Sequence, residues 1–346
     1  MPRYKLTIAY DGTDFCGWQK QEPFVDSHTS PKEARRLASG ERTAPGAETD
    51  GAAALAHDAM IFEQLGTREG ETRPRVALRT VQAVVERAVR EIVREPITLH
   101  GSSRTDAGVH AWGQVAAFSC SPWEQKSAGD VGAGDAIEDA EGGGMGGRGM
   151  GWPLERGTER LLRAVNSRLP DDVIVRAIEP ASHLFDPTND ATSKAYSYTL
   201  HTGEMRALRD RRFVHHIRER LDVAAMHEAA QQLVGEHDFV SFAALHHGRL
   251  TTVRTVFSCS VCEVQSADTV DAAAGVRRVR IDVSGSGFLY NMVRIISGTL
   301  VEVGKGRMKP GDIPDILAAK DRRRAGPTLP GSGLCLEWIK YAASEG

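Results

Sequence analysis

Residues 276–303 read VRRVRIDVSGSGFLYNMVRIISGTLVEV, and the spacing of their apolar side chains changes in the middle. Residues 276–283 alternate apolar and charged side chains, which is the period of two of a half-buried strand. Two glycines within 285–287 interrupt that pattern, and the apolar run of 288–303 has the length of a helix. A strand followed directly by a helix indicates a fold in which helices cover a sheet.

The residues on either side of this stretch complete a set of five further elements. They are a strand at Lys194–Leu200, a helix between Asp222 as N-cap and Gly235 as terminator, a strand at Thr252–Val264, a short helix at Asp312–Ala319 and a closing strand at Leu334–Tyr341. Tyr196, Tyr198 and Leu200 would share one face of the first strand. The second half of the chain therefore reads strand, helix, two strands, helices, strand.

The first half of the chain repeats this order. Its elements are a strand from Tyr4 to Tyr10, a helix capped by Thr80 with its apolar face from Val81 to Ile92, short strands at Ile97–His100 and Gln114–Phe118, a helix at Thr158–Arg168 and a strand at Val173–Ile178. Two such halves predict an α+β protein built from two sandwiches of the split βαβ kind, side by side.

Two stretches do not fit this framework, and they carry most of the acidic charge. Residues 22–75 sustain no apolar face, and residues 121–151 contain 10 of the 35 glycines. We interpret both as insertions. Together they hold 16 Asp+Glu and 9 Lys+Arg, so the net charge of −3 for the chain becomes +4 for the remaining 261 residues. A nucleic-acid partner is therefore compatible with the framework.

Composition excludes several other classes of protein. No run approaches the roughly 18 apolar residues of a membrane-spanning helix, and the N-terminus does not resemble a signal peptide. Five thinly spread cysteines argue against a secreted disulfide scaffold. We expect a protein of the cytoplasm, with an organelle as the alternative.

The loop Arg104-Thr105-Asp106-Ala107-Gly108-Val109-His110 is the strongest candidate for chemistry. An acid beside an arginine, small residues and a glycine would let a substrate approach the carboxylate closely. The alternative is a tight turn in which Asp106 accepts backbone hydrogen bonds and Arg104 is a surface charge. The loop by itself leaves both interpretations open.

RTDAGVHA, followed by GQVAAF, closely resembles the signature loop of the TruA-type tRNA pseudouridine synthases. Seven further segments are similar to that family and follow in its order: YKLTIAYDGTDFCGWQKQ, RTVQAVVERAVREI, LPDDVIV, SKAYSYTL, GEHDFVSF, SGSGFLYNMVRIISGTLVEVG and AGPTLPGSGL. The resemblance covers most of the chain outside the two insertions. Several long motifs in one order are more specific than any single loop.

The resemblance implies the pseudouridine synthase fold: two ferredoxin-like or RRM-like halves that form one continuous, mainly antiparallel sheet, with helices on one face and a central cleft. We assign residues 1–180 to the half with the aspartate loop and 181–346 to the other half. The implied activity is conversion of uridine to pseudouridine on the 3′ side of the tRNA anticodon stem-loop, at tRNA positions 38 to 40, by a homodimer. No metal or organic cofactor is implied.

Three residues match the catalytic positions of the family. Asp106 would be the catalytic aspartate, and Arg294 would keep its carboxylate charged inside a closed pocket, where desolvation raises the pKa. Tyr196 would stack on the extruded uracil and serve, directly or through water, in removing the C5 proton. The alternatives are a surface-paired helix arginine for Arg294 and a core aromatic for Tyr196.

Four further loop residues are substrate-binding candidates by the same resemblance: Arg104, Thr105, Gly108 and His110. Arg104 would fill the space left by the extruded base or contact phosphate. His110 would have a structural role or contact RNA, and we do not expect it to act as a general base.

One motif departs from the family. Many members carry Phe-His-Ala-Arg or Phe-Asp-Ala-Arg before the tyrosine strand, whereas this chain has Phe185-Asp186-Pro187-Thr188. The arginine is missing, which puts its RNA or structural contact in doubt, and Pro187 stiffens the segment.

Other motifs are weak. Cys259 and Cys262 have CxxC spacing without a second pair to complete a zinc site. The histidine pairs 215–216 and 246–247 have no carboxylate or cysteine pattern around them, so we expect them to face RNA or solvent. Gly285 and Gly287 precede a helix, but no Walker lysine follows.

Two other kinds of function stay open from the sequence. A catalytically idle tRNA-binding or chaperone protein could keep the fold, although the retention of Asp106, Tyr196 and Arg294 together argues against it. A carboxylate-dependent glycosidase lacks the second acid that such chemistry normally needs.

Overall fold

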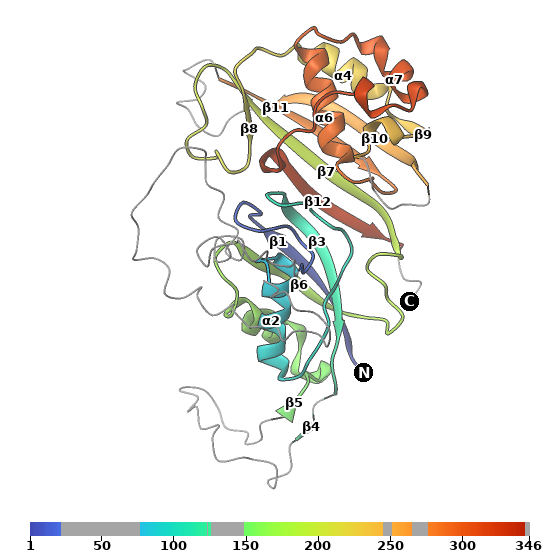
Figure 1. The fold of residues 1–346 in the computed structure, drawn as a ribbon. Coiled ribbons are helices and arrows are strands. Elements are labelled where there is room, and N and C mark those ends of the chain that lie inside the picture. The colour runs from blue at the N-terminus through green and yellow to red at the C-terminus, as the bar shows by residue number, and fades with distance from the viewer. Residues whose placement is uncertain (22–76, 123, 126–148, 245–250, 265–275, 343–346) are drawn as a thin grey trace, which may run out of the picture.

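A computed structural model describes residues 1–21, 77–122, 124–125, 149–244, 251–264 and 276–342. Its main feature is one large sheet with the strand order β6-β1-β3-β12-β7-β11-β10-β9, in which β2 also pairs with β3 and β8 with β7. Figure 1 shows this sheet running through both halves of the molecule. The expected α+β class with a continuous sheet is confirmed.

The first half has six main elements. They are β1 (Arg3–Tyr10), α2 (Val81–Val93), β2 (His100–Gly101), β3 (His110–Ser119), α3 (Thr158–Asn166) and β6 (Val173–Ala181). Their spatial order is β6-β1-β3-β2, and all neighbours are antiparallel. This is the βαββαβ arrangement of a ferredoxin-like unit. Outside it, β4 (Glu124–Gln125) pairs with β5 (Gly149–Met150).

The second half repeats that arrangement. Its equivalent elements are β7 (Ala191–Thr202), α4 (Val223–Gln231), β10 (Val253–Val264), β11 (Arg277–Gly285), α6 (Met292–Gly304) and β12 (Leu334–Tyr341). Their spatial order, β12-β7-β11-β10, is again antiparallel throughout. The half adds β8 (His215–Ile217), β9 (Gly235–Asp238) and α7 (Ile313–Ala319). Short 3-10 turns lie at Leu154–Arg156, Val240–Phe242, Pro310–Asp312, Arg322–Arg324 and Gly331–Gly333.

The two halves meet at a short seam. β3 pairs in parallel with β12 over only two residue pairs, Cys335 with His110 and Leu336 with Ala111. β2 occupies the other end of the same edge of β3. Because both halves keep the same strand order and direction, right-handed crossovers place the helices of both on one face of the sheet. The loop between β2 and β3 therefore leaves the sheet beside the seam.

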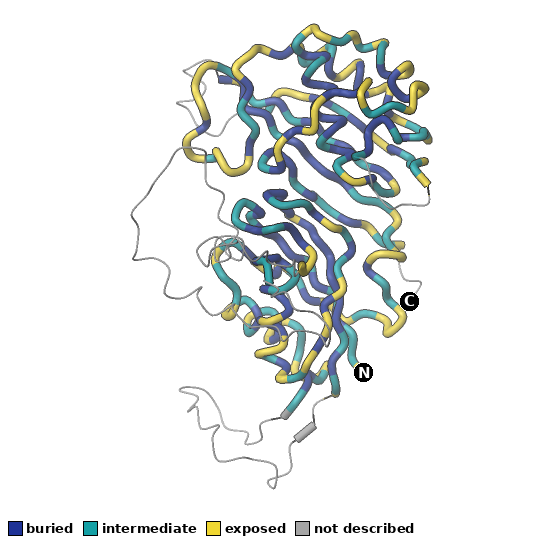
Figure 2. The backbone as a smooth tube through the Cα atoms, in the orientation of Figure 1, coloured by how far each residue is buried: buried dark blue, intermediate teal, exposed yellow. Residues whose placement is uncertain are grey.

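Alternation and capping explain the first elements. Tyr4, Leu6 and Ile8 of β1 are fully buried, whereas the residues between them are partly exposed. The Thr80 hydroxyl accepts a hydrogen bond from the amide of Ala83 and caps α2, as expected. Figure 2 shows the buried residues following the strands, with exposed residues on the outer surfaces and along the loop that precedes β8.

Several expected boundaries were wrong. The strand expected at Ile97–His100 is β2 at His100–Gly101, because the Leu99 amide donates to the Glu86 carboxylate instead of to a neighbouring strand. β3 begins at His110 rather than Gln114, because its first residues pair with β12, a contact that local sequence does not reveal. α6 begins at Met292 rather than Phe288, because Asn291 has the left-handed conformation with φ 60°. Gly235 does not end α4, which stops at Gln231, but starts β9 with φ 114°.

The two expected insertions lie largely outside the described residues. None of residues 22–75 is described, and of residues 121–151 only 121–122, 124–125 and 149–151 are described. No helix in the described part of the chain is long and apolar enough to cross a membrane.

Candidate active site

The loop that carries Asp106 is fixed by the turn that follows β1. The amide of Trp18 donates to the carbonyl of Thr105 (3.0 Å), and the amide of Gly108 donates to the carbonyl of Phe15 (3.3 Å). Within the loop, the Val109 amide donates to the Asp106 carbonyl (3.1 Å). Asp106 therefore lies in a tight turn. Its backbone carbonyl takes part in that turn, whereas its carboxylate makes its contact outside the loop.

Two glycines allow other segments to approach this loop closely. A Cβ atom on Gly17, whose φ is +99°, would lie 2.6 Å from the Thr105 carbonyl oxygen. A Cβ atom on Gly331 would lie 2.7 Å from the Ala107 carbonyl oxygen. Gly17 belongs to the first half and Gly331 to the second, so both halves press on the loop. The sequence had not singled out either glycine.

The Asp106 carboxylate forms an ion pair with Arg294 across the two halves. Arg294 Nη1 lies 3.0 Å from Asp106 Oδ2, and the two side chains are 18% and 26% exposed, respectively. Arg294 is the third residue of α6, so the interpretation as a surface-paired helix arginine was wrong. The helix projects its guanidinium toward the seam instead of the solvent.

Two further contacts hold the guanidinium in place. Nε of Arg294 donates to the Leu329 carbonyl (2.7 Å), and Nη1 also donates to Asn291 Oδ1 (2.7 Å). Asn291 directly precedes α6, yet its side chain makes no capping bond to the helix backbone. Its left-handed backbone, which asparagine tolerates better than most residues, accompanies this role. Sequence reasoning missed Asn291 and Leu329. Asn291 lay inside the helix expected from Phe288, where an asparagine was the only available signal.

Burial and the ion pair act on Asp106 in opposite directions. Desolvation raises the pKa of its carboxyl above the usual range, and the nearby charge and hydrogen bond of Arg294 only partly offset that rise. The carboxylate is thus held in a site where its charged form depends on one arginine.

Tyr196 lies on β7 beside the start of the loop. Its hydroxyl is 2.9 Å from Ser103 Oγ, and its ring meets Phe288 edge-on with centroids 5.3 Å apart. Burial raises the pKa of the phenol to about 12, and the Asp106 charge adds to that rise. Lys194, on the same strand, donates from Nζ to the Ser102 carbonyl (2.8 Å). β7 therefore brings Tyr196 and the Asp106 loop together.

The other loop candidates occupy different environments. Arg104 is exposed, so its side chain is available to a ligand. Thr105 is buried, and its hydroxyl lies 2.7 Å from the Tyr10 hydroxyl. Gly108 has φ 77° and forms part of the wall of a pocket.

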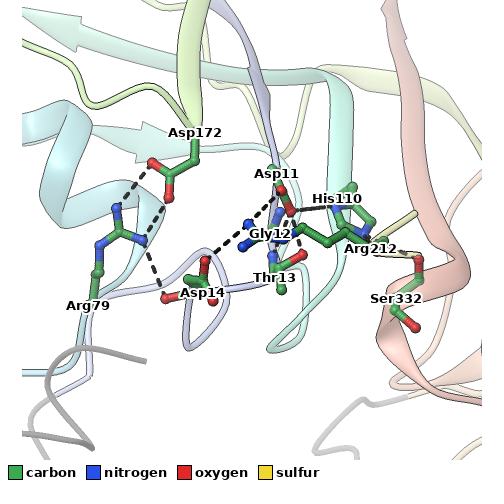
Figure 3. A network of polar contacts seen from close by, with 9 residues as sticks. All are labelled: Asp11, Gly12, Thr13, Asp14, Arg79, His110, Asp172, Arg212 and Ser332. Atoms are coloured by element: carbon green, nitrogen blue, oxygen red, sulfur yellow. Dashed lines mark hydrogen bonds and ion pairs between the residues drawn. The ribbon is translucent and has the colours of Figure 1, made fainter. Parts of the chain in front are cut away.

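His110 is only 3% exposed and lies in a polar network that links the halves (Figure 3). Its Nδ1 accepts from the Gly12 amide (3.0 Å), and its Nε2 lies 2.9 Å from the Arg212 carbonyl and 3.2 Å from the Ser332 carbonyl. Because carbonyls only accept, Nε2 carries the ring proton. All these partners are protein atoms. Of the two roles expected for His110, structural support and RNA contact, this arrangement favours structural support.

The same network continues through Asp11, which anchors the turn after β1 (Figure 3). Burial alone would raise the pKa of Asp11, but the hydroxyl and amide of Thr13 both donate to its Oδ1 and hold that pKa well below its usual range. Arg212 Nη1 reaches both Asp11 Oδ2 (3.4 Å) and Asp14 Oδ2 (3.3 Å). The turn and the segment before β8 are thereby connected.

Arg79 ties the other side of this turn to the start of β6. Its guanidinium pairs with both carboxylate oxygens of Asp172, at 2.9 and 3.0 Å, and donates to the Asp14 carbonyl (3.3 Å). It also covers the Phe15 ring, 4.0 Å from the centroid. The turn that supports the Asp106 loop is consequently held from both sides.

The segment that departs from the family motif makes local contacts. Asp186 Oδ1 accepts from the amides of Thr188 (2.7 Å) and Asn189 (3.0 Å). The Thr188 hydroxyl donates to the Gly101 carbonyl (3.0 Å), and the Tyr341 hydroxyl donates to the Pro187 carbonyl (2.9 Å). The segment therefore joins β2 to β12 without an arginine.

The cysteine and histidine pairs singled out in the sequence do not form a metal site in the described part of the chain. Cys259 is buried and Cys262 is exposed on β10, since an odd spacing on a strand gives opposite faces. His215 and His216 begin β8, while the pair at 246–247 lies outside the described residues. Within the described ranges, no three His, Cys, Asp or Glu side chains converge as a metal site.

A pocket of about 630 Å³ opens beside the Asp106 loop at the seam. Its lining residues come from the first half, from the chain that leads into β8 with the first two residues of that strand, and from the turn before β12. They are Thr13, Gly108, Arg206, Ala207, Arg211, Arg212, Val214, His215, His216 and Ser332. Basic side chains dominate this lining, which makes it suited to an anionic ligand.

Comparison with known proteins identifies close relatives of the chain. Residues 229–342 match a family model described as tRNA pseudouridine synthase. A protein named tRNA pseudouridine synthase A from Geotalea uraniireducens is 38% identical over 341 residues, covering 99% of this chain and 100% of the relative. Proteins of the same name from Geobacter sulfurreducens (37%, 82% of this chain, 98% of the relative) and Brevibacillus brevis (36%, 99% and 100%) are similar to it as well.

Proposed function

Because this chain belongs to the tRNA pseudouridine synthase family, we propose that it isomerises uridine to pseudouridine in tRNA. The reaction breaks the N-glycosidic bond, turns the uracil ring and rejoins it to the sugar through C5, with loss of the C5 proton. The observation that carries the proposal is the 3.0 Å ion pair between Asp106 and Arg294 at the seam. A base must leave the RNA stack to reach such a carboxylate.

Asp106 is the group that acts on the sugar and ring, as a nucleophile or as a stabiliser of developing positive charge. Either role requires the ionised form. Burial disfavours that form, and Arg294 favours it by charge and by a hydrogen bond. Because Asn291 and Leu329 orient the guanidinium, the arginine supports Asp106 without having to reorganise during the reaction.

Tyr196 would act at the later step, removal of the C5 proton, directly or through water. A pKa of about 12 keeps its hydroxyl protonated in the free enzyme near neutral pH. The negative charge of Asp106 contributes to this high pKa. Once Asp106 is neutralised by bonding to the substrate, that contribution disappears and the phenol becomes more acidic. Charge at Asp106 thus couples the two steps.

The finer expectations are part of the same proposal. The substrate region is the anticodon stem-loop, approached by the exposed Arg104. Thr105 and Gly108 shape the loop beside the target uridine. The working form is a homodimer, located in the cytoplasm or in an organelle. No disulfide joins the five cysteines, all of which lie in the described ranges, and this suits a reducing compartment.

The decisive experiment compares Asp106→Asn with the wild type on tRNA transcripts, with pseudouridine measured by mass spectrometry. We expect a loss of at least about 10³-fold in the variant. Asp171→Asn, which alters an exposed carboxylate, is the matched control and should keep full activity. An active Asp106→Asn enzyme would show that the catalytic assignment is wrong.

The same assay separates the alternative functions. Tight tRNA binding without any pseudouridine from the wild type would identify an idle RNA-binding protein, and release of free uracil would identify a glycosidase. Anticodon-arm fragments that react as well as full tRNA would support the proposed region. Sedimentation of the free protein as a monomer at working concentration would exclude the homodimer.

A further inference from the structure

The lining of the pocket beside the Asp106 loop contains two kinds of side chain. Thr13, Gly108 and Ser332 are uncharged and lie beside the polar network of Figure 3. The chain from Arg206 to His216, which leads into β8, contributes three arginines and two histidines. No carboxylate lines the pocket among the residues the structure describes.

Two of the three arginines are not neutralised. Within the described part of the chain, neither Arg206 nor Arg211 forms an ion pair, and both are exposed. Arg212 differs, because Asp11 and Asp14 hold its guanidinium at 3.4 and 3.3 Å. The Asp210 carboxylate in the same segment is engaged by Arg278 at 2.7 Å. Positive charge is therefore concentrated on Arg206 and Arg211.

His215 adds little to that charge near neutral pH. Burial lowers the pKa of His215, and the nearby His216 and Lys305 lower it further, so its ring stays neutral. His216 Nε2 lies 2.7 Å from the Gly203 carbonyl and donates its proton there. The two rings consequently shape the pocket, while the arginines supply its charge.

The position of the pocket limits which anion could enter it. Gly108 follows Asp106 by two residues, so their backbones are separated by at most about 7 Å. Phosphates along one nucleic-acid strand follow one another every few ångströms, about 3.4 Å per nucleotide along a duplex axis. A strand whose uridine reaches Asp106 therefore has a neighbouring phosphate near the pocket. Guanidinium groups bind phosphate with two parallel hydrogen bonds.

We infer that this pocket is a phosphate-binding subsite in which Arg206 and Arg211 hold a backbone phosphate of the strand that carries the target uridine. The inference rests on the proposed function, since that function supplies the RNA. The subsite fixes the strand relative to Asp106, while Arg212, also in the lining, is held in place by its contacts with Asp11 and Asp14. Arg206 and Arg211 are positioning residues that do not touch the reacting atoms.

The test measures tRNA affinity as a function of salt for a double variant, Arg206→Ala with Arg211→Ala. Each lost phosphate contact should reduce the slope of log affinity against log salt by about one. Because the two arginines hold one phosphate, we expect the slope to fall by about 0.7 to 0.9 and the dissociation constant at low salt to rise about tenfold. Thermal unfolding of the variant should match the wild type, because both side chains are exposed.

Arg218→Ala with Arg220→Ala is the matched control. It removes the same charge from exposed positions just beyond β8 that do not line the pocket. Its slope and its activity should stay unchanged. A third variant, Arg206→Lys with Arg211→Lys, keeps the charge and should restore the slope while recovering only part of the affinity, because lysine lacks the planar fork.

Two outcomes would overturn the inference: an unchanged slope in the pocket variant, or an equal fall in pocket and control variants, which would indicate general surface charge. Failure of the proposed function gives a different result, because it appears as absent pseudouridine in the wild type. Salt dependence and product formation are thus independent readouts. If the salt slope falls only in the Arg206 and Arg211 variant while the wild type makes no pseudouridine, the phosphate subsite would stand and the protein would be an RNA-binding protein.

Discussion

The two halves of the molecule place an arginine at the same position and use it differently. α3 and α6 are topologically equivalent helices, and the third residue of each is an arginine, Arg160 in α3 and Arg294 in α6. Arg160 is exposed and forms no ion pair with any described residue. Arg294 is held by three oxygen atoms and faces Asp106 of the other half.

Burial of the helix causes this difference. α3 buries only Leu161 and Val165, so most of its side chains face solvent. α6 is buried along nearly its whole length, between the sheet and the chain that returns through Leu329. A Cβ atom on Gly298 would lie 1.8 Å from the Pro327 carbonyl oxygen, which shows how closely that return packs. The same helix position becomes functional only where a second half closes over it.

The largest effect is expected at Arg294. Arg294→Ala removes the group that opposes desolvation of Asp106, so the pKa of that carboxyl should rise further. Activity requires the ionised carboxylate and is lost as the pH falls through its pKa. The acid limb of kcat/KM should therefore move to higher pH, with a loss of about 100-fold near neutral pH. Arg160→Ala should leave the pH profile of kcat/KM unchanged. An equal shift of the acid limb in both variants would show that the two helix arginines do not differ in function.

The next effect is expected on stability at the seam. His110→Ala leaves the Gly12 amide without its buried acceptor and removes a link to Arg212 and Ser332. We expect a loss of about 2–4 kcal/mol in the free energy of unfolding, measured in urea. The exposed His183 offers the control, His183→Ala, which should cost almost nothing. Equal stability of the two variants would show that the network does not join the halves.

A smaller effect separates backbone conformation from hydrogen bonding at Asn291. Asn291→Gly keeps the left-handed conformation but removes the acceptor for Arg294, so kcat should fall about tenfold with little change in Tm. Asn291→Ala should lower kcat similarly and also lower Tm, because alanine pays about 1–2 kcal/mol for that conformation. Arg94→Gly, at another left-handed position, is the control and should not affect kcat. A lower kcat in Asn291→Ala alone would assign the effect to the backbone.

The smallest effect concerns the stability cost of Asp106. Its pKa is raised in the folded protein, so its favourable contribution is complete below its unfolded pKa and is lost as the pH rises through the folded value. At neutral pH, Asp106→Asn should therefore keep or slightly raise Tm. Asp172→Asn should lower Tm instead, because it breaks the two-pronged pair with Arg79. A fall of several degrees in Asp106→Asn would mean that this ion pair is structural.

Local sequence determined most of the framework. Alternating residues in β1, the Thr80 and Asp222 caps, and the closing strand Leu334–Tyr341 were predicted where the structure has them. The caps depend on contacts within one element. The buried face of a strand or helix appears in the sequence as apolar residues that repeat every two or every 3.6 residues. The resemblance to a family also assigned Asp106, Tyr196 and Arg294 to one catalytic site.

Only the tertiary structure decided how those residues are held. Asn291, Leu329, Gly17 and Gly331 support the site through contacts between residues far apart in the chain, and no local period records such contacts. The early start of β3 has the same cause, because its first residues pair with β12 of the other half. The burial of His110 and the free charge of Arg206 and Arg211 likewise depend on which segments meet at the seam. Sequence specifies each element by its own residues, whereas a site between two halves exists only once both have packed.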